Sequence, residues 1–155
     1  MKHLIILLAT GFGIGFLPVA PGTFGTILSL LIWWFFFPDK FFIQMILLLS
    51  AFILAFFISD MAEKIFAKKD DKRIVVDEIV GFWLALIGLP KKFFFVLISF
   101  FIFRILDILK LPFIKKVQKL NGGAGIVLDD IVAGLLTNFI VNIVIFACQI
   151  CRARF

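Results

Sequence analysis

The chain has 155 residues, of which 63% are hydrophobic, and its formal net charge at pH 7 is +6. Soluble domains are about 45–50% apolar, and a domain of this size has too little interior to hide such an excess. The composition therefore excludes an ordinary soluble domain and predicts one membrane-embedded domain over residues 1–155.

Apolar stretches separated by polar or Gly/Pro-rich segments predict the helices. They lie at 4–17, 26–37, 41–59, 79–90, 93–103 and 131–150. Only 41–59 and 131–150 approach the roughly 20 uncharged residues needed to cross a bilayer. Glycines break the first stretch, and Pro38 ends the second. We expect an all-α fold, a small polytopic membrane helical bundle with some short or broken helices.

The basic residues predict the orientation of the bundle. If the amino terminus is cytoplasmic and the stretches alternate, eleven of the sixteen Lys and Arg residues lie inside, in agreement with the positive-inside rule. We interpret the basic loops as orientation signals that also attract anionic lipid, and we expect no nucleic-acid partner. The segments 17–26, 60–78, 104–110 and 121–130 all fall on the cytoplasmic face, which indicates one site.

The first two polar segments contain a turn and a pair of carboxylates. Pro21-Gly22 is a turn signal, and Thr23 could cap the next helix, whose N-terminal amides favour an anion; alternatively the segment is only a turn. Residues 68–73 are a mixed-charge run expected to be a solvated loop. Asp77 and Glu78 directly precede an apolar stretch, where they would be metal ligands or helix-capping charges.

The third segment places Arg104, Asp107 and Lys110 three residues apart, so on a helix they share one face. A guanidinium grips phosphate with two parallel hydrogen bonds, and a neighbouring carboxylate can hold a metal. The alternative is a simple i,i+3 salt bridge at the membrane interface.

The fourth segment joins a glycine-rich run to two adjacent carboxylates. We expect residues 121–125 to form a flexible loop in which Gly123 allows close approach to a phosphate. Asp129 and Asp130 point about 100° apart on a helix, so one can bind a metal while the other holds a water, a lysine or an arginine.

The candidate ligands are hard oxygens. His3 is the single histidine, and the Cys148–Cys151 pair lies at the far end of the chain, so a zinc site lacks ligands. Carboxylates without histidine or cysteine favour Mg²⁺, which commonly binds substrate phosphate as well. The pattern predicts phosphate-ester chemistry at a membrane surface.

Four motifs in this order resemble the bacterial phosphatidylglycerophosphatase A family. They span 18–26, 77–81, 103–110 and 122–134 and so cover nearly the whole chain. Leu106, and the Leu111 that separates Lys110 from Pro112, depart mildly from the family pattern without touching a charge. The resemblance implies Mg²⁺-dependent hydrolysis of phosphatidylglycerophosphate to phosphatidylglycerol and phosphate, in the bacterial inner membrane.

These expectations assign a role to each candidate residue. The catalytic candidates are Asp77, Asp107, Asp129 and Asp130; the phosphate-binding candidates are Thr23, Arg104, Lys110 and Gly123; the metal-ligand candidates are Asp77, Glu78, Asp107 and Asp129. Two other functions stay open: an ion pathway through the bundle, and a lipid-binding scaffold that has lost activity.

Overall fold

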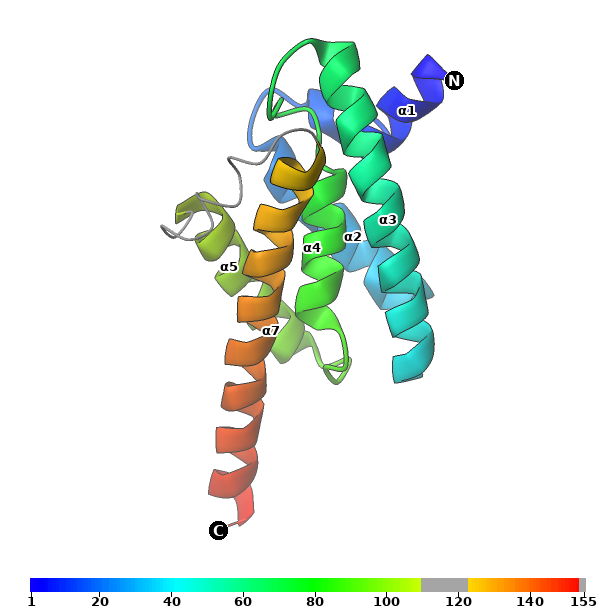
Figure 1. The fold of residues 1–155 in the computed structure, drawn as a ribbon. Helices are drawn as coiled ribbons and strands as arrows, with labels where there is room; N and C mark the ends of the chain where they lie inside the picture. Colours follow the sequence, from blue (N-terminus) through cyan, green and yellow to red (C-terminus); the bar gives the residue numbers. More distant parts are fainter. Residues whose placement is uncertain (110–122, 154–155) are drawn as a thin grey trace.

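The computed structural model describes residues 1–109 and 123–153, and these residues form helices and no strand (Figure 1). The elements are α1 (Lys2–Ala9), the short 3₁₀ helix η1 (Ile14–Phe16), α2 (Pro21–Phe36), α3 (Phe41–Phe66), α4 (Val76–Leu86), α5 (Phe93–Leu109) and α7 (Gly123–Ala153). The predicted all-α fold, with its short and broken helices, is confirmed.

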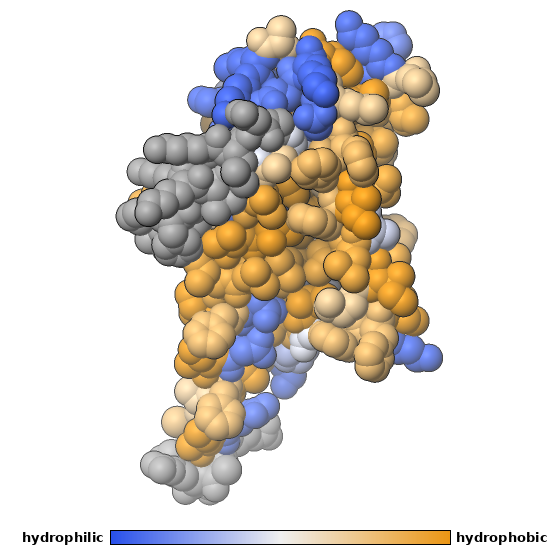
Figure 2. All heavy atoms as spheres, in the orientation of Figure 1, coloured by the Kyte–Doolittle hydropathy of each residue, from blue (hydrophilic) through white to orange (hydrophobic). Residues whose placement is uncertain are grey.

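Two helices are long and apolar enough to cross a bilayer: α3 over Phe41–Phe66 and α7 over Gly123–Cys151. Most of their apolar side chains face outward, whereas seven of the eleven residues of α4 are buried. Figure 2 shows hydrophobic side chains around the middle of the molecule and hydrophilic ones gathered at its upper end. This is the architecture of a small helical membrane protein.

The crossing of α4 and α7 depends on Gly81 and Gly134. A Cβ on Gly81 would lie 2.8 Å from the Cβ of Asp130, and a Cβ on Gly134 would overlap the carbonyl oxygen of Gly81. Small residues let membrane helices approach to backbone contact. The close approach brings Asp130 of α7 beside the first turns of α4.

Asn138 provides hydrogen bonds to the carbonyl oxygens at the buried carboxyl end of the short helix α4. Its side-chain amide donates to the carbonyl oxygens of Ala85 at 3.1 Å and Ile87 at 2.9 Å. Gln44 of α3 accepts a hydrogen bond from the N–H of Gly88 at 3.1 Å. A helix that ends inside an apolar bundle needs such partners, because no water reaches its free carbonyls and amides.

An aromatic core lies directly behind the polar end. Trp33 of α2, Phe82 of α4 and Phe103 of α5 are fully buried, and the rings of Phe82 and Phe103 are 5.5 Å apart. Because Phe103 is anchored in this core, the next residue, Arg104, is held at the boundary between the core and the polar end.

The prediction of a flexible loop at 121–125 is wrong from Gly123 onward, since α7 begins at that residue. Asn121 and Gly122 lie outside the described residues. Gly123 packs against α3, where a Cβ would overlap the carbonyl oxygen of Phe56 and lie 2.9 Å from the nitrogen of Asp60. Close helix packing, rather than loop flexibility, accounts for this glycine.

Candidate active site

A cavity of about 670 Å³ opens at the polar end of the bundle, among α2, α4, α5 and α7. Its wall contains residues from 18–23, 70–78, 104–108 and 129–130, so each of the four polar segments contributes to it. The prediction that these segments meet at one site is confirmed for the described residues.

Part of the cavity wall is a group of three carboxylates. Asp77 and Glu78 lie in the first turn of α4 and Asp130 lies on α7, and one oxygen from each falls within 4.8 Å of the others. Asp77 and Asp130 are buried, and Glu78 is partly buried. Asp77 Oδ1, Glu78 Oε2 and Asp130 Oδ1 are buried atoms without a hydrogen-bond partner among the described residues.

Such a group is costly without a cation, because like charges in a dry interior repel and lose hydration. A divalent ion would satisfy the unpartnered oxygens and compensate the charge. Hard oxygen donors of this kind suit Mg²⁺ or Ca²⁺. The residues present therefore fit a divalent metal site.

Arg104 also lines the cavity, close to the Glu78 carboxylate, since both side chains lie against Gly22. Its Nη1 lies 2.6 Å from Asp107 Oδ2, and both side chains are 13% exposed. Nη1 also donates to Thr26 Oγ1 at 3.4 Å, whereas Nε is buried without a partner among the described residues. The i,i+3 salt bridge is thus formed, and it leaves one buried donor of the guanidinium without a partner among the described residues.

Asp129 lies in the cavity wall but outside the three-carboxylate group. It is buried, and its Oδ1 accepts a hydrogen bond from the N–H of Asp130 at 3.2 Å. Asp107, paired with Arg104, also lies outside the group. The metal-ligand set predicted from the sequence contained Asp107 and Asp129, whereas the geometry brings Asp130 to Asp77 and Glu78.

Thr23 lines the cavity, yet it does not cap α2. The helix begins at Pro21, and Ala20 is the capping residue, with φ of +47° and no side-chain hydrogen bond. Proline is favoured at the first helical position, because its missing N–H would have no partner there. The interpretation of Thr23 as a helix cap is therefore wrong, while contact of Thr23 with phosphate stays a prediction.

Of the predicted phosphate-binding residues, Gly123 does not line the cavity. The N–H of Gly123 donates to Asp60 Oδ1 at 3.4 Å, away from the cavity wall. Lys110 lies outside the described residues. For both, contact with phosphate stays a prediction.

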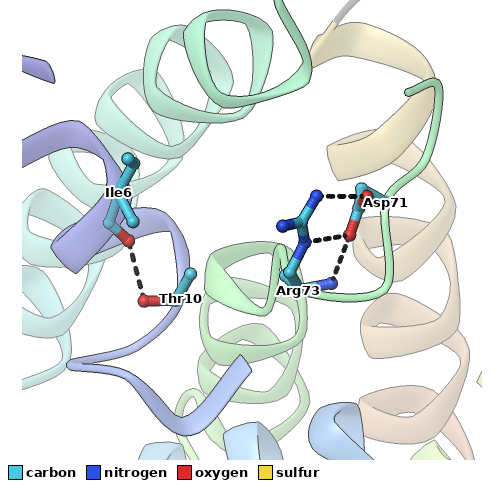
Figure 3. Close-up of polar contacts among 4 residues, drawn as sticks. All are labelled: Ile6, Thr10, Asp71 and Arg73. Carbon is cyan, nitrogen blue, oxygen red and sulfur yellow. Dashed lines mark hydrogen bonds and ion pairs between the residues drawn. The ribbon is translucent and has the colours of Figure 1, made fainter. Parts of the chain in front are cut away.

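Asp71 was expected in a solvated loop, and this is wrong. It is only 5% exposed, and its carboxylate accepts hydrogen bonds from Arg73 Nε at 2.8 Å, Nη2 at 2.9 Å and the backbone N–H at 3.0 Å (Figure 3). The Arg73 guanidinium holds the pKa of Asp71 below its usual value. The guanidinium also lies 3.9 Å from the ring centre of Phe66.

The Asp71–Arg73 pair shapes the loop that forms one wall of the cavity. Asp71 and its neighbour Lys72 both line the cavity, so Lys72 adds a second cation that sequence reasoning did not single out. Near this loop, α1 ends at Ala9. The Oγ1 of the next residue, Thr10, donates to the carbonyl oxygen of Ile6 at 2.7 Å (Figure 3). In the sequence, the Asp-x-Arg spacing of residues 71 and 73 was the signal that could have predicted this ion pair, but it lies within a run of mixed charges.

The fold and cavity define a class of protein: a small helical membrane protein with a buried carboxylate cluster facing an arginine. The family model for phosphatidylglycerophosphatase A matches residues 7–145, and the chain belongs to this family of phosphoric monoester hydrolases.

Curated relatives agree with this assignment. The chain is 34% identical to the phosphatidylglycerophosphatase A of Escherichia coli K12, over 84% of this chain and 77% of that protein. It is 33% identical to the Haemophilus influenzae protein of the same name, over 94% and 88%. A Bacteroides thetaiotaomicron protein provisionally named phosphatidylinositol-3-phosphatase is 34% identical over 92% and 94%. No solved structure matches the chain.

Proposed function

We propose that this chain is a Mg²⁺-dependent lipid phosphatase that hydrolyses phosphatidylglycerophosphate to phosphatidylglycerol and inorganic phosphate. The observation that carries the proposal is one cavity in which a buried group of three carboxylates faces Arg104, in a member of this family. We place the enzyme in the bacterial inner membrane as a multi-pass protein with its cavity on the cytoplasmic face.

Arg104 is proposed to bind the phosphate of the headgroup. Its guanidinium is mostly buried, so hydrogen bonds to an anion are strengthened there, and its Nε lacks a partner among the described residues. Asp107 fixes the orientation of this side chain through the 2.6 Å ion pair. Thr23 and Lys72 line the same cavity and can contact the remaining phosphate oxygens.

Asp77, Glu78 and Asp130 are proposed to hold Mg²⁺. When bound, the ion would neutralise phosphate charge and lower the pKa of a coordinated water. Asp129, next to Asp130 in the wall, is proposed to accept the proton of the attacking water. Water then adds at phosphorus, the ester P–O bond breaks, and the leaving glycerol oxygen takes up the proton that Asp129 accepted from the water.

The Bacteroides relative supports a second candidate substrate, an inositol phospholipid with a phosphomonoester on its ring.

An ion pathway is disfavoured, because in the described helices no charged side chain lies in the apolar middle of the bundle. A scaffold without activity is disfavoured because the predicted acidic residues converge on one cavity.

The test is phosphate release by the purified protein in mixed micelles. Phosphatidylglycerophosphate and phosphatidylinositol 3-phosphate are compared at equal surface concentration, with and without a divalent-ion chelator. We expect release from phosphatidylglycerophosphate that stops with the chelator and returns with Mg²⁺. A higher rate of phosphate release from phosphatidylinositol 3-phosphate would make the inositol lipid the substrate. Full activity after exhaustive chelation would overturn the metal site.

A further inference from the structure

A second cavity, about 340 Å³ in volume, lies between the later turns of α2 and the first turns of α5. Leucine, valine, tryptophan and phenylalanine side chains from 30–35 and 93–97 line it, and none of them is charged. We propose that this groove binds an acyl chain of the lipid whose phosphate lies in the polar cavity. The inference rests on the proposed function and extends it to the apolar part of the substrate.

The same two helices line both cavities. The first turn of α2 and the last turns of α5 contribute Thr23, Arg104 and Ile108 to the polar cavity, and the opposite ends of these helices form the apolar groove. A ligand that occupies the polar cavity therefore has the groove below it, along the same pair of helices.

Helical spacing places residues of both cavities on one face of each helix. On α2, Thr23, Ile27 and Trp34 share a face, since residues three or four apart lie above one another. On α5, Phe101 and Leu97 lie on the same face as Arg104, toward the start of the helix. Ile27 and Phe101, which lie between the two cavities along these helices, are both exposed.

The depth of the groove matches the depth of an acyl chain. Leu97 lies about 10 Å along α5 from Arg104, and Phe93 lies about 17 Å from it, at a rise of about 1.5 Å per residue. One leaflet of hydrocarbon is about 15 Å thick. A lipid with its terminal phosphate at Arg104 would reach this interval with an acyl chain, beyond the two glycerol groups and the phosphodiester that separate the chain from that phosphate.

The groove would act by positioning the lipid rather than by affinity alone. Lipid tails are as apolar as leucine, so moving a chain from the bilayer into the groove gains little hydrophobic free energy. A chain held in the groove would instead align the phosphate with Arg104 and the carboxylates, and such alignment raises the rate of reaction. Filling the groove should therefore lower kcat/KM for lipid without damaging the polar cavity.

Leu31→Trp and Leu97→Trp each fill the groove, and Leu49→Trp on α3 is the matched control on an exposed surface away from both cavities. Each variant is assayed on long-chain phosphatidylglycerophosphate and on its deacylated, water-soluble headgroup. We expect kcat/KM for the long-chain lipid to fall about tenfold in the groove variants, with the headgroup rate and the control unchanged. Equal losses on both substrates, or no loss on either, would overturn the proposal.

A second measurement is independent of turnover. Phosphatidylglycerophosphate with a photoreactive diazirine in mid-chain is irradiated with the protein, and the labelled peptides are identified by mass spectrometry. We expect adducts within 30–35 and 93–97 that excess unlabelled phosphatidylglycerophosphate displaces and phosphatidylcholine does not. If both lipids displace the label equally, the groove contacts only bulk lipid, and the proposed acyl-chain site is refuted. Selective labelling without hydrolysis would refute the proposed reaction and leave the groove standing.

Discussion

Gly22, in the first turn of α2, lies directly against the Glu78 carboxylate of α4. A Cβ at position 22 would overlap Glu78 Oε1 and would lie 3.4 Å from Arg104 Nη1. The Pro-Gly pair that resembles a simple turn in the sequence thus also makes room for two charged groups of the cavity.

Replacing Gly22 with Ala should therefore disturb the site more than the fold. Alanine is favoured over glycine in a helix by about 1 kcal/mol, so α2 itself should form. The added methyl group must displace Glu78, and phosphate release should fall by about tenfold or more. Activity and thermal unfolding are measured in the same detergent; normal turnover would show that the crowding at Glu78 is harmless.

Asp77→Asn and Asp130→Asn should separate stability from activity. Each change removes one buried negative charge, so without divalent ions the variants should unfold at the same temperature as the wild type or higher. Stabilisation of the wild type by added Mg²⁺ should be lost, because a ligand stabilises only the state that binds it. Phosphate release should fall by orders of magnitude.

Asp39→Asn is the matched control for these two variants, since Asp39 is highly exposed beside Lys91 at the other end of the bundle. It should retain both turnover and the Mg²⁺-dependent rise in unfolding temperature. An unchanged Mg²⁺ response in Asp130→Asn would remove that residue from the metal site.

Arg104→Lys should be severely impaired although the charge is kept. A lysine ammonium cannot form the two parallel hydrogen bonds of a guanidinium, and it would not reproduce the Arg104 contacts to Asp107 and Thr26. Asp107→Asn leaves the guanidinium in place but removes its anchor, and phosphate release should again fall by orders of magnitude. Near-normal steady-state kinetics in both variants would exclude Arg104 as the phosphate-binding group.

Asp71→Asn should lower the unfolding temperature, in contrast to a substitution in a solvated loop. The charge-assisted bonds to Arg73 would be lost, although exposure of the guanidinium limits how much they stabilise the fold. The pKa of Asp71 is lower in the folded protein, so its stabilising effect is complete above the unfolded pKa of about 4 and is lost as pH falls through the folded pKa. The stability difference between wild type and variant should shrink as pH falls below about 4 and vanish only below the lowered folded pKa of Asp71; a constant difference across pH would contradict the ion pair.

Cysteines introduced at Lys40 and Lys69 should report the orientation. These positions flank α3, so a membrane-impermeant thiol reagent added to intact cells should label only one of them. We expect position 40 to react and position 69, beside the cavity, to be protected until the membrane is opened. Labelling of position 69 alone would place the cavity on the outer face.

The sequence by itself determined the membrane class and the polar segments that form the cavity. A continuous apolar run such as 41–59 needs lipid around it whatever its neighbours are, and charges are excluded from such runs, so polar residues collect at the ends. The motif order also identified the family before any geometry was known.

Only the tertiary structure decided which polar residues meet. Asp129 and Asp130 are equivalent in the sequence, and the close crossing of α4 and α7 turns Asp130 toward Asp77 and Glu78. Burial of Asp71 likewise depends on how the loop after α3 folds back against Arg73. The rotation of a helix about its axis, and the distance at which it crosses its neighbour, follow from packing between segments far apart in the chain, and local sequence patterns do not specify them.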